Sequence, residues 1–67
     1  MRPIKEYWCD NSPKYEDIIN AHSVCCTIDC VIILRWFVKY NGHHKLIIKK
    51  EDNIEDLWNQ VPKIYGV

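Results

Sequence analysis

The stretch Val31-Ile-Ile-Leu-Arg-Trp-Phe-Val-Lys-Tyr40, followed by Asn41-Gly42 and then by His43-His-Lys-Leu-Ile-Ile-Lys-Lys50, decides the fold of this chain. Both flanks are rich in β-branched and aromatic residues, which favour strands, and the Asn-Gly pair between them is a strong signal for a tight turn. The stretch therefore predicts a β-hairpin with strands over 31–40 and 43–50.

The length of the turn determines which side chains share a face, because a shift of one residue moves all side chains of one strand to the other face. A two-residue turn at Asn41-Gly42 mixes polar and apolar residues on both faces. A three-residue loop, Tyr40-Asn41-Gly42, with the glycine at positive φ in a bulge, separates them. We expect this second register, because it provides a continuous apolar face for a core: Ile32, Leu34, Trp36, Val38, Leu46 and Ile48.

A first helix is predicted over 13–22. Ser12-Pro13 is a typical helix start, with serine as the N-cap and proline at the first helical position. Beyond His22 the pattern is ambiguous, since residues 24–30 fit both a helical and an alternating period. Because Val, Thr and Ile favour strands over helices, we expect the helix to stop near His22 and a strand to run to about Asp29.

A second helix is predicted over 53–61, where Asp52 or Asn53 can serve as the N-cap and Pro62 is expected to end the helix. Residues 4–9 alternate in a way that fits a short strand. Both helices need the apolar face of the hairpin. The prediction is therefore a small two-layer α+β domain, with an antiparallel sheet of three to four strands and both helices on one face.

With 67 residues, the chain is expected to form a single compact domain over 1–67. A chain of this size buries only roughly 60% of its unfolded surface, so its stability margin is small and burial against a partner or a second copy is expected to help. No catalytic site, metal or cofactor is expected, because the chain has no glycine-rich phosphate loop, no nucleophile elbow and no spaced pair of carboxylates in a predicted cleft.

Nine basic and nine acidic residues give a net charge of zero, but the charges are unevenly placed. The hairpin is basic and the segment after it is acidic. The amino terminus shows no secretory signal, and the apolar run over 24–38 is too short to cross a bilayer. Together with the adjacent pair Cys25-Cys26, these features predict a cytoplasmic or nuclear protein with reduced thiols.

The hairpin face turned away from the helices is the candidate functional surface. It combines an apolar centre with a basic rim, a composition that favours binding to an acidic protein surface or self-association. An exposed sheet face without a binding role is the alternative. The expected partner-binding residues are Ile33, Arg35, Phe37, Lys39, His43, Lys45, Ile47 and Lys49. The abundance of Ile, Lys and Asn is typical of an AT-rich genome, and small binders of this kind are frequent among viral or phage modulators and inhibitors of host proteins.

Nucleic-acid binding is the alternative function, because basic residues interleave with Trp36, Phe37 and Tyr40. The predicted order of helix, strands and helix is similar to that of double-stranded-RNA-binding domains, which implies phosphate contacts. That family uses a basic start to its last helix, whereas residues 51–56 are mostly acidic here. Neutral net charge also speaks against this alternative.

The histidines of the turn allow a further alternative. Gly42-His43-His44 is similar to the Gly-Ser-His turn of HicA-type messenger-RNA-cleaving toxins. That resemblance implies a toxin-like ribonuclease in which a turn histidine acts as general base or acid. Zinc is a remaining option for the cysteines and histidines, but their spacing lacks a Cys-x-x-Cys pair, so we expect no metal site.

Overall fold

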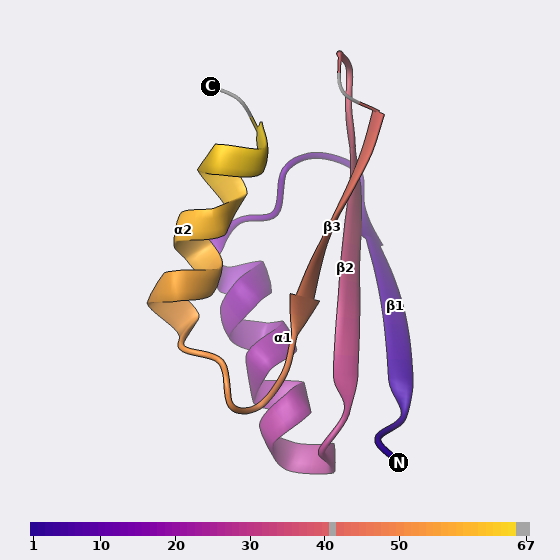
Figure 1. The fold of residues 1–67 in the computed structure, drawn as a ribbon, viewed down its shortest axis with the longest axis vertical. Helices are drawn as coiled ribbons and strands as arrows, with labels where there is room; N and C mark the ends of the chain where they lie inside the picture. Colours follow the sequence, from indigo (N-terminus) through magenta and orange to yellow (C-terminus); the bar gives the residue numbers. More distant parts are fainter. Residues whose placement is uncertain (41, 66–67) are drawn as a thin grey trace.

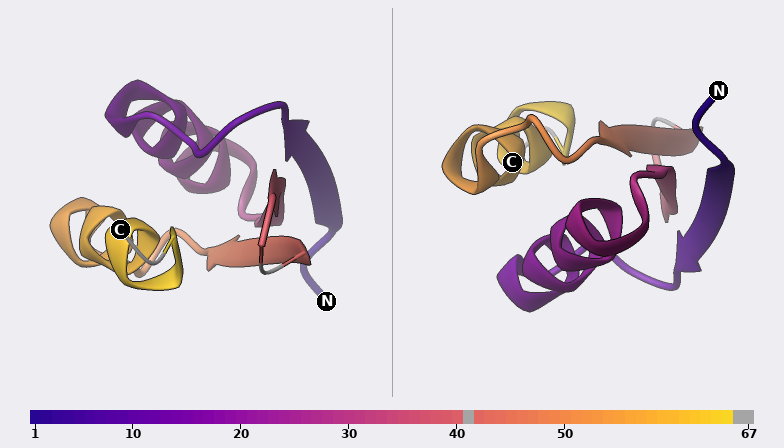
Figure 2. Two further views of the ribbon diagram at one scale, coloured as in Figure 1. Left: turned by 90° about the horizontal axis from the view of Figure 1, so that it is seen from above. Right: turned by 90° about the horizontal axis from the view of Figure 1, so that it is seen from below.

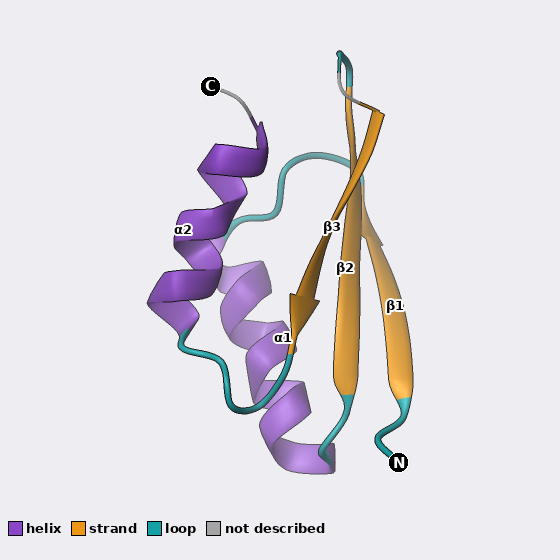
Figure 3. Ribbon diagram, viewed as in Figure 1, coloured by secondary structure: helices purple, strands orange, loops and turns teal. Residues whose placement is uncertain are grey.

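Three strands and two helices follow one another in the order β1 (Ile4–Cys9), α1 (Tyr15–Ile28), β2 (Val31–Val38), β3 (Gly42–Ile48) and α2 (Ile54–Tyr65) in a computed structural model (Figure 1). The structure describes residues 1–40 and 42–65, with side chains up to Val61. The strands form one layer and the helices another (Figure 3), and the views from above and below place both helices on the same side of the sheet (Figure 2). The predicted two-layer α+β domain is confirmed.

The sheet is mixed and has the strand order β1-β2-β3. β2 and β3 pair antiparallel as the predicted hairpin, whereas β1 pairs parallel with β2, from Ile4 opposite Val31 to Cys9 opposite Trp36. Parallel neighbours cannot be joined by a tight turn and need a crossover, which α1 provides. The sequence prediction of an antiparallel sheet therefore holds for the hairpin, while the third strand arrives through a β-α-β connection.

The hairpin pairs Val38 with Gly42, whereas the predicted loop over 40–42 would pair Lys39 with His43. The positive φ expected for Gly42 is confirmed at 76°. Asn41, the other half of the predicted turn signal, lies outside the described residues. Each residue of β2 is therefore paired two positions earlier in β3 than predicted. An even displacement leaves every side chain on its predicted face, so the predicted division into an apolar and a polar face is kept.

Core packing explains the register that the hairpin adopts. The predicted loop would place Lys50 opposite Ile32 on the apolar face. In the structure, Ile48 is opposite Ile32 instead, and Trp36 is opposite His44, with the two rings 6.0 Å apart and tilted by 31°. The strands are accordingly shorter than predicted, ending at Val38 and at Ile48, and Lys50 lies beyond the sheet.

The bounds of helix α1 differ most from the sequence prediction. It begins at Tyr15, later than predicted, and continues through residue 28, so the strand expected between Val24 and Asp29 does not form. Its buried residues are Ile18, Ala21 and Cys25, which lie on one helical face against the sheet. Burying this face outweighs the weak strand preference of Val, Thr and Ile, which is worth only about 0.7 kcal/mol per residue or less.

Both ends of α1 are set by local hydrogen bonds and backbone geometry. The N-cap is Lys14 and not the predicted Ser12, and the backbone N–H of Lys14 donates to the Asp17 carboxylate at 2.8 Å. At the other end, Asp29 adopts a left-handed conformation with φ 51°. Aspartate tolerates this conformation better than most residues, so it ends the helix and turns the chain into β2.

Helix α2 starts as predicted and ends later. The Asn53 side-chain oxygen accepts hydrogen bonds from the backbone N–H groups of Glu55 and Asp56, at 2.9 and 3.3 Å, which identifies Asn53 as the N-cap. The helix continues past Pro62 to residue 65. Proline removes one backbone hydrogen bond and bends a helix, but its fixed φ is still helical, so it does not have to end one.

A single core lies between the two layers. The helix-facing side of β2 and β3 supplies its centre, one face of each helix covers it, and a cysteine at the start of β2 closes one end. The buried residues are Ile18, Ala21, Cys25, Cys30, Ile32, Leu34, Trp36, Leu46, Ile48, Leu57 and Val61.

Candidate binding surface

The sheet face opposite the helices, called the outer face below, is open. Strand pairing aligns three rows of side chains across it. The rows are Glu6, Ile33 and Ile47; Trp8, Arg35 and Lys45; and Phe37 with His43. Ile4 continues the face at the start of β1. The other side of β2 and β3 carries the core, so the outer face is the side on which a partner can cover all three strands.

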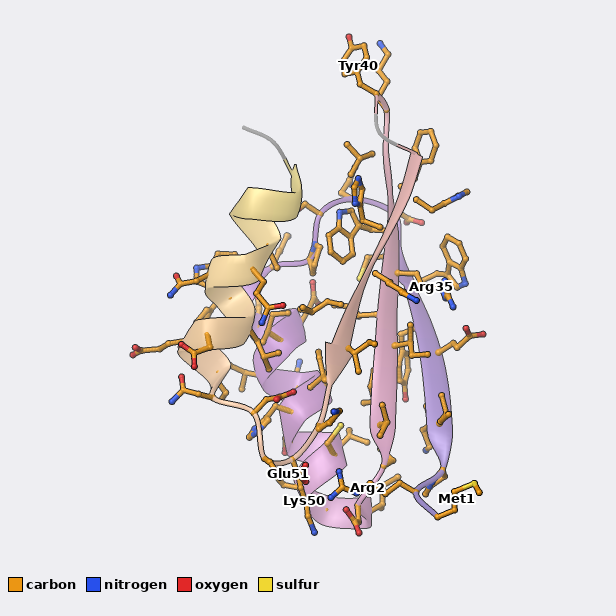
Figure 4. All side chains as sticks on the ribbon, viewed as in Figure 1. Met1, Arg2, Arg35, Tyr40, Lys50 and Glu51 are labelled. Atoms are coloured by element: carbon orange, nitrogen blue, oxygen red, sulfur yellow. The ribbon has the colours of Figure 1, made fainter. Side chains whose placement is uncertain are left out.

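Six of the eight residues predicted for partner binding come together on this face. They are Ile33, Arg35, Phe37, His43, Lys45 and Ile47. The other two lie at its ends. Lys39 is in the hairpin loop, with its Nζ 5.5 Å from the centre of the Tyr40 ring, and Lys49 follows β3. Figure 4 shows Tyr40 at the tip of the hairpin, so Lys39 belongs to the tip.

Strand β1 adds residues that the sequence prediction left out. Its even-numbered side chains, Ile4, Glu6 and Trp8, extend the outer face beyond the hairpin. Trp8 is 61% exposed and Ile4 66% exposed. The alternation of residues 4–9 is the sequence signal for this strand, but alternation alone does not tell which strand it joins.

Three rings form an aromatic cluster on the outer face. The His43 ring lies 5.2 Å from the Trp8 ring and 5.3 Å from the Phe37 ring, with edge-on geometry in both pairs. The His43 ring on β3 thus reaches across β2 and contacts the Trp8 ring on β1. With Phe37 53% and Ile47 44% exposed, large apolar and aromatic side chains lie next to each other in solvent. Adjacent exposed groups of this kind mark interaction surfaces more often than scattered ones do.

The charges of the outer face are predominantly positive. Arg35 donates from Nη2 to the Glu6 carboxylate at 2.8 Å, which neutralises the acid of this face. Lys45 then adds a positive charge on the edge strand β3, opposite Arg35, and Lys39 and Lys49 add one at each end. The charges not paired with Glu6 on this face are therefore basic, as the sequence predicts.

A second group of charges lies at the other end of the molecule from the hairpin tip (Figure 4). Arg2 contacts Asp29 at 3.1 Å and Glu51 at 2.6 Å, and Lys50 contacts Asp29 at 3.2 Å. The hydrogen bond from Arg2 lowers the pKa of the Glu51 carboxyl below its ordinary value and raises the pKa of Arg2. These exposed pairs join the chain start to two loops and do not belong to the outer face.

The histidines of the turn separate onto opposite faces. His43 lies on the outer face, while His44 points to the core side against Trp36. The contacts of His43 are aromatic rings and not carboxylates or hydroxyls that orient a catalytic base. In addition, β1 precedes α1, so the helix-strands-helix order on which the resemblance to double-stranded-RNA-binding domains rests covers only the part of the chain from α1 to α2.

The four cysteines are free and lie in different surroundings. Cys25 and Cys30 are buried with their sulfur atoms 3.9 Å apart, and Cys25 donates to the Ile48 carbonyl at 3.3 Å. Cys26 is exposed beside His22, and Cys9 is half-buried at the end of β1. Among the residues that the structure describes, no three His, Cys, Asp or Glu side chains lie close enough to hold a metal ion.

Stability should fall at alkaline pH because of Cys25. Burial first, and the hydrogen bond with Cys30 second, raise the pKa of this thiol from 9.0 to about 11. The unfolded chain therefore loses the Cys25 proton from pH 9.0 upward, while the folded chain keeps it until about pH 11, so this contribution is complete below pH 9.0 and lost as pH rises through that window. Urea unfolding of the wild type and of Cys25→Ala between pH 9.0 and about pH 11 measures the contribution of Cys25 to stability. Cys26→Ala is the control and should keep the wild-type slope; equal slopes in all three proteins would contradict the prediction.

Comparisons with models of protein families, with curated protein sequences and with solved structures find no match for this chain. In the described part of the chain, neither helix is long and apolar enough to cross a membrane. The fold and the surface together define a small α+β domain with one open, aromatic and basic sheet face. Its functional assignment rests on that geometry.

Proposed function

We propose that this domain is a non-catalytic protein-binding module that acts through the outer face, as a modulator or inhibitor of a host protein of the kind that viruses and phages encode. The observation that carries the proposal is the cluster of Trp8, Phe37 and His43 with Ile47 beside it, exposed on a sheet whose opposite face is packed. Rigid aromatic side chains lose little conformational entropy on binding and supply much of the affinity at protein interfaces.

The basic rim supports a partner with an acidic surface. Lys45 lies on the outer face opposite Arg35, while Lys39 and Lys49 lie at its two ends, and rim charges of this kind mainly speed association and select the partner. The free cysteines, with Cys25 and Cys30 adjacent and unbonded, support action in a reducing compartment, for which we propose the cytoplasm.

Nucleic-acid binding is a second candidate, favoured by one specific observation. Exposed rings on a sheet face surrounded by lysines are the elements by which single-stranded RNA or DNA is bound, through base stacking and phosphate neutralisation. The two candidates differ in their salt dependence. Binding to phosphates weakens steeply as salt increases, whereas burial of aromatic side chains against a protein does not.

Native mass spectrometry of the untagged protein isolated from its host cells tests the proposal. A complex with a second protein that persists at raised salt is the expected result. A nucleic-acid complex that is lost at raised salt would replace the proposal with the second candidate. A bare monomer from cells in which the protein is expressed contradicts both, and a doubled mass would identify a second copy as the partner.

A further inference from the structure

A groove lies between β1 and α1 on the helix side of the sheet, and it reaches Trp8 at the edge of the outer face. It has a volume of about 310 Å³, near the lower end of the range for ligand pockets, which is about 300 to 1,000 Å³. Tyr7 and Cys9 of β1 form one wall, Ala21 and Val24 of α1 form the other, and β2 contributes Leu34. The groove is mainly apolar and has room for one or two aliphatic side chains.

The free edge of the sheet runs along this groove. β1 is an edge strand, and the Pro3 carbonyl accepts a hydrogen bond from the Val31 N–H at 2.9 Å. In an extended strand, backbone groups point alternately to the two sides, so Lys5, Tyr7 and Cys9 bond toward β2 as Pro3 does. The N–H and C=O groups of the even-numbered residues, Ile4, Glu6 and Trp8, therefore point away from the sheet, and no strand of the described part of the chain lies beside them.

We propose that the β1 edge and the groove form a binding site for an extended peptide segment of a partner protein, with an aliphatic side chain in the groove and a lysine or arginine next to it. A strand added to an edge presents alternate side chains to the two sides of the sheet. One set would therefore enter the groove and the other would lie beside Ile4 and Trp8. Ile4, Tyr7 and Trp8 of this edge strand are exposed, so an added strand would cover apolar and aromatic surface.

Negative charge at the groove is the reason that we expect a basic residue in the peptide. Asp17 lines the groove near Cys9, and Asp10 directly follows β1. Burial first, and then these two carboxylates, raise the pKa of the Cys9 thiol above its ordinary value. A cationic side chain next to the buried aliphatic one would meet them, whereas the outer face selects for acidic groups. The groove shares only Trp8 with the outer-face residues named above, so it forms a second site that extends the proposed function.

Selection from a phage-displayed library of random dodecapeptides against the full chain tests the proposal. Enriched peptides are expected to share an aliphatic residue with a lysine or arginine within two positions. Asn20→Trp places a large side chain over the groove from an exposed position of α1 and should lower the affinity about tenfold or more. Asn59→Trp, an exposed change on α2, is the matched control and should bind as the wild type does.

Amide hydrogen exchange of the protein with a synthetic copy of the most enriched peptide supplies a second readout. The N–H groups of Ile4, Glu6 and Trp8 should become protected when the peptide binds, and those of Lys5, Tyr7 and Cys9 should change little because they already face β2. No enrichment, binding retained in Asn20→Trp, or no protection of the even-numbered amides would each overturn the proposal. Protection that appears without peptide and rises with protein concentration would also overturn it, since the occupant would then be a second copy.

The outer-face variant Phe37→Asp separates this proposal from the proposed function. It should bind the selected peptides with wild-type affinity, because Phe37 is not part of the groove. Loss of peptide binding in Phe37→Asp with no effect of Asn20→Trp would place the peptide on the outer face and leave the proposed function standing alone.

Discussion

Replacing Trp36 by alanine is expected to unfold the domain. Trp36 is fully buried at the centre of the core, and truncation of a buried tryptophan to alanine costs about 3 to 5 kcal/mol. A chain of 67 residues has a total stability of about 3 to 10 kcal/mol, so the loss removes much or all of it. The indole Nε1 makes no hydrogen bond within the described residues, which lowers the cost slightly, but lost packing dominates.

Urea unfolding followed by far-ultraviolet circular dichroism measures this effect without relying on tryptophan fluorescence. Trp8→Ala is the matched control, because it removes the same side chain from an exposed position on the same sheet. It should cost well under half as much as Trp36→Ala. Equal losses in the two variants would show that the outer face is part of a core, and the surface proposed for binding would then be wrong.

Phe37→Asp is expected to abolish partner binding while leaving the fold intact. Phe37 is 53% exposed and contacts the His43 ring, so its loss removes an interface aromatic and places a carboxylate against an acidic partner. Central aromatic residues of interfaces typically contribute about 2 kcal/mol or more, which corresponds to a loss of affinity of about thirtyfold. Titration calorimetry with the partner found by native mass spectrometry measures it, and thermal unfolding reports on the fold.

Ile19→Asp is the control for this experiment. Ile19 is 38% exposed on α1, so the change adds the same charge at an exposed apolar position on the helix side. Its binding should match that of the wild type. Weakening of binding by Ile19→Asp as large as that by Phe37→Asp would mean that the outer face does not carry the interaction. If Phe37→Asp fails to fold, the register of the hairpin faces is in error.

Much of the candidate surface could be predicted from local sequence. In a strand, neighbouring side chains point to opposite faces, so the face of Phe37 and Ile47 depends only on whether the loop length is odd or even. The predicted loop was displaced by one residue along the chain, yet it had the correct length. For this reason the six of the eight predicted residues that lie in the observed strands share the outer face.

The contribution of β1 could not be predicted in the same way. Its alternation of Ile4, Glu6 and Trp8 is visible in the sequence, but its parallel pairing with β2 depends on the path of α1. If the first helix stopped near His22, another strand would fill the following segment and could occupy the edge of the sheet. The aromatic cluster of Trp8 with His43, and the groove between β1 and α1, follow from that path.

By itself, the sequence determined the hairpin, its two faces, a cap for the second helix at Asp52 or Asn53 and the basic character of the exposed surface. Each of these depends on residues close together in the chain, where side-chain alternation, turn residues and capping act over a few positions. Only the tertiary structure decided that residues 24–28 are helical, that β1 joins the hairpin in parallel, and which hairpin pairs face the core. The physical reason is burial: Cys25, Trp36 and Ile48 gain more from a shared core than local preferences cost, and that gain exists only once distant segments have met.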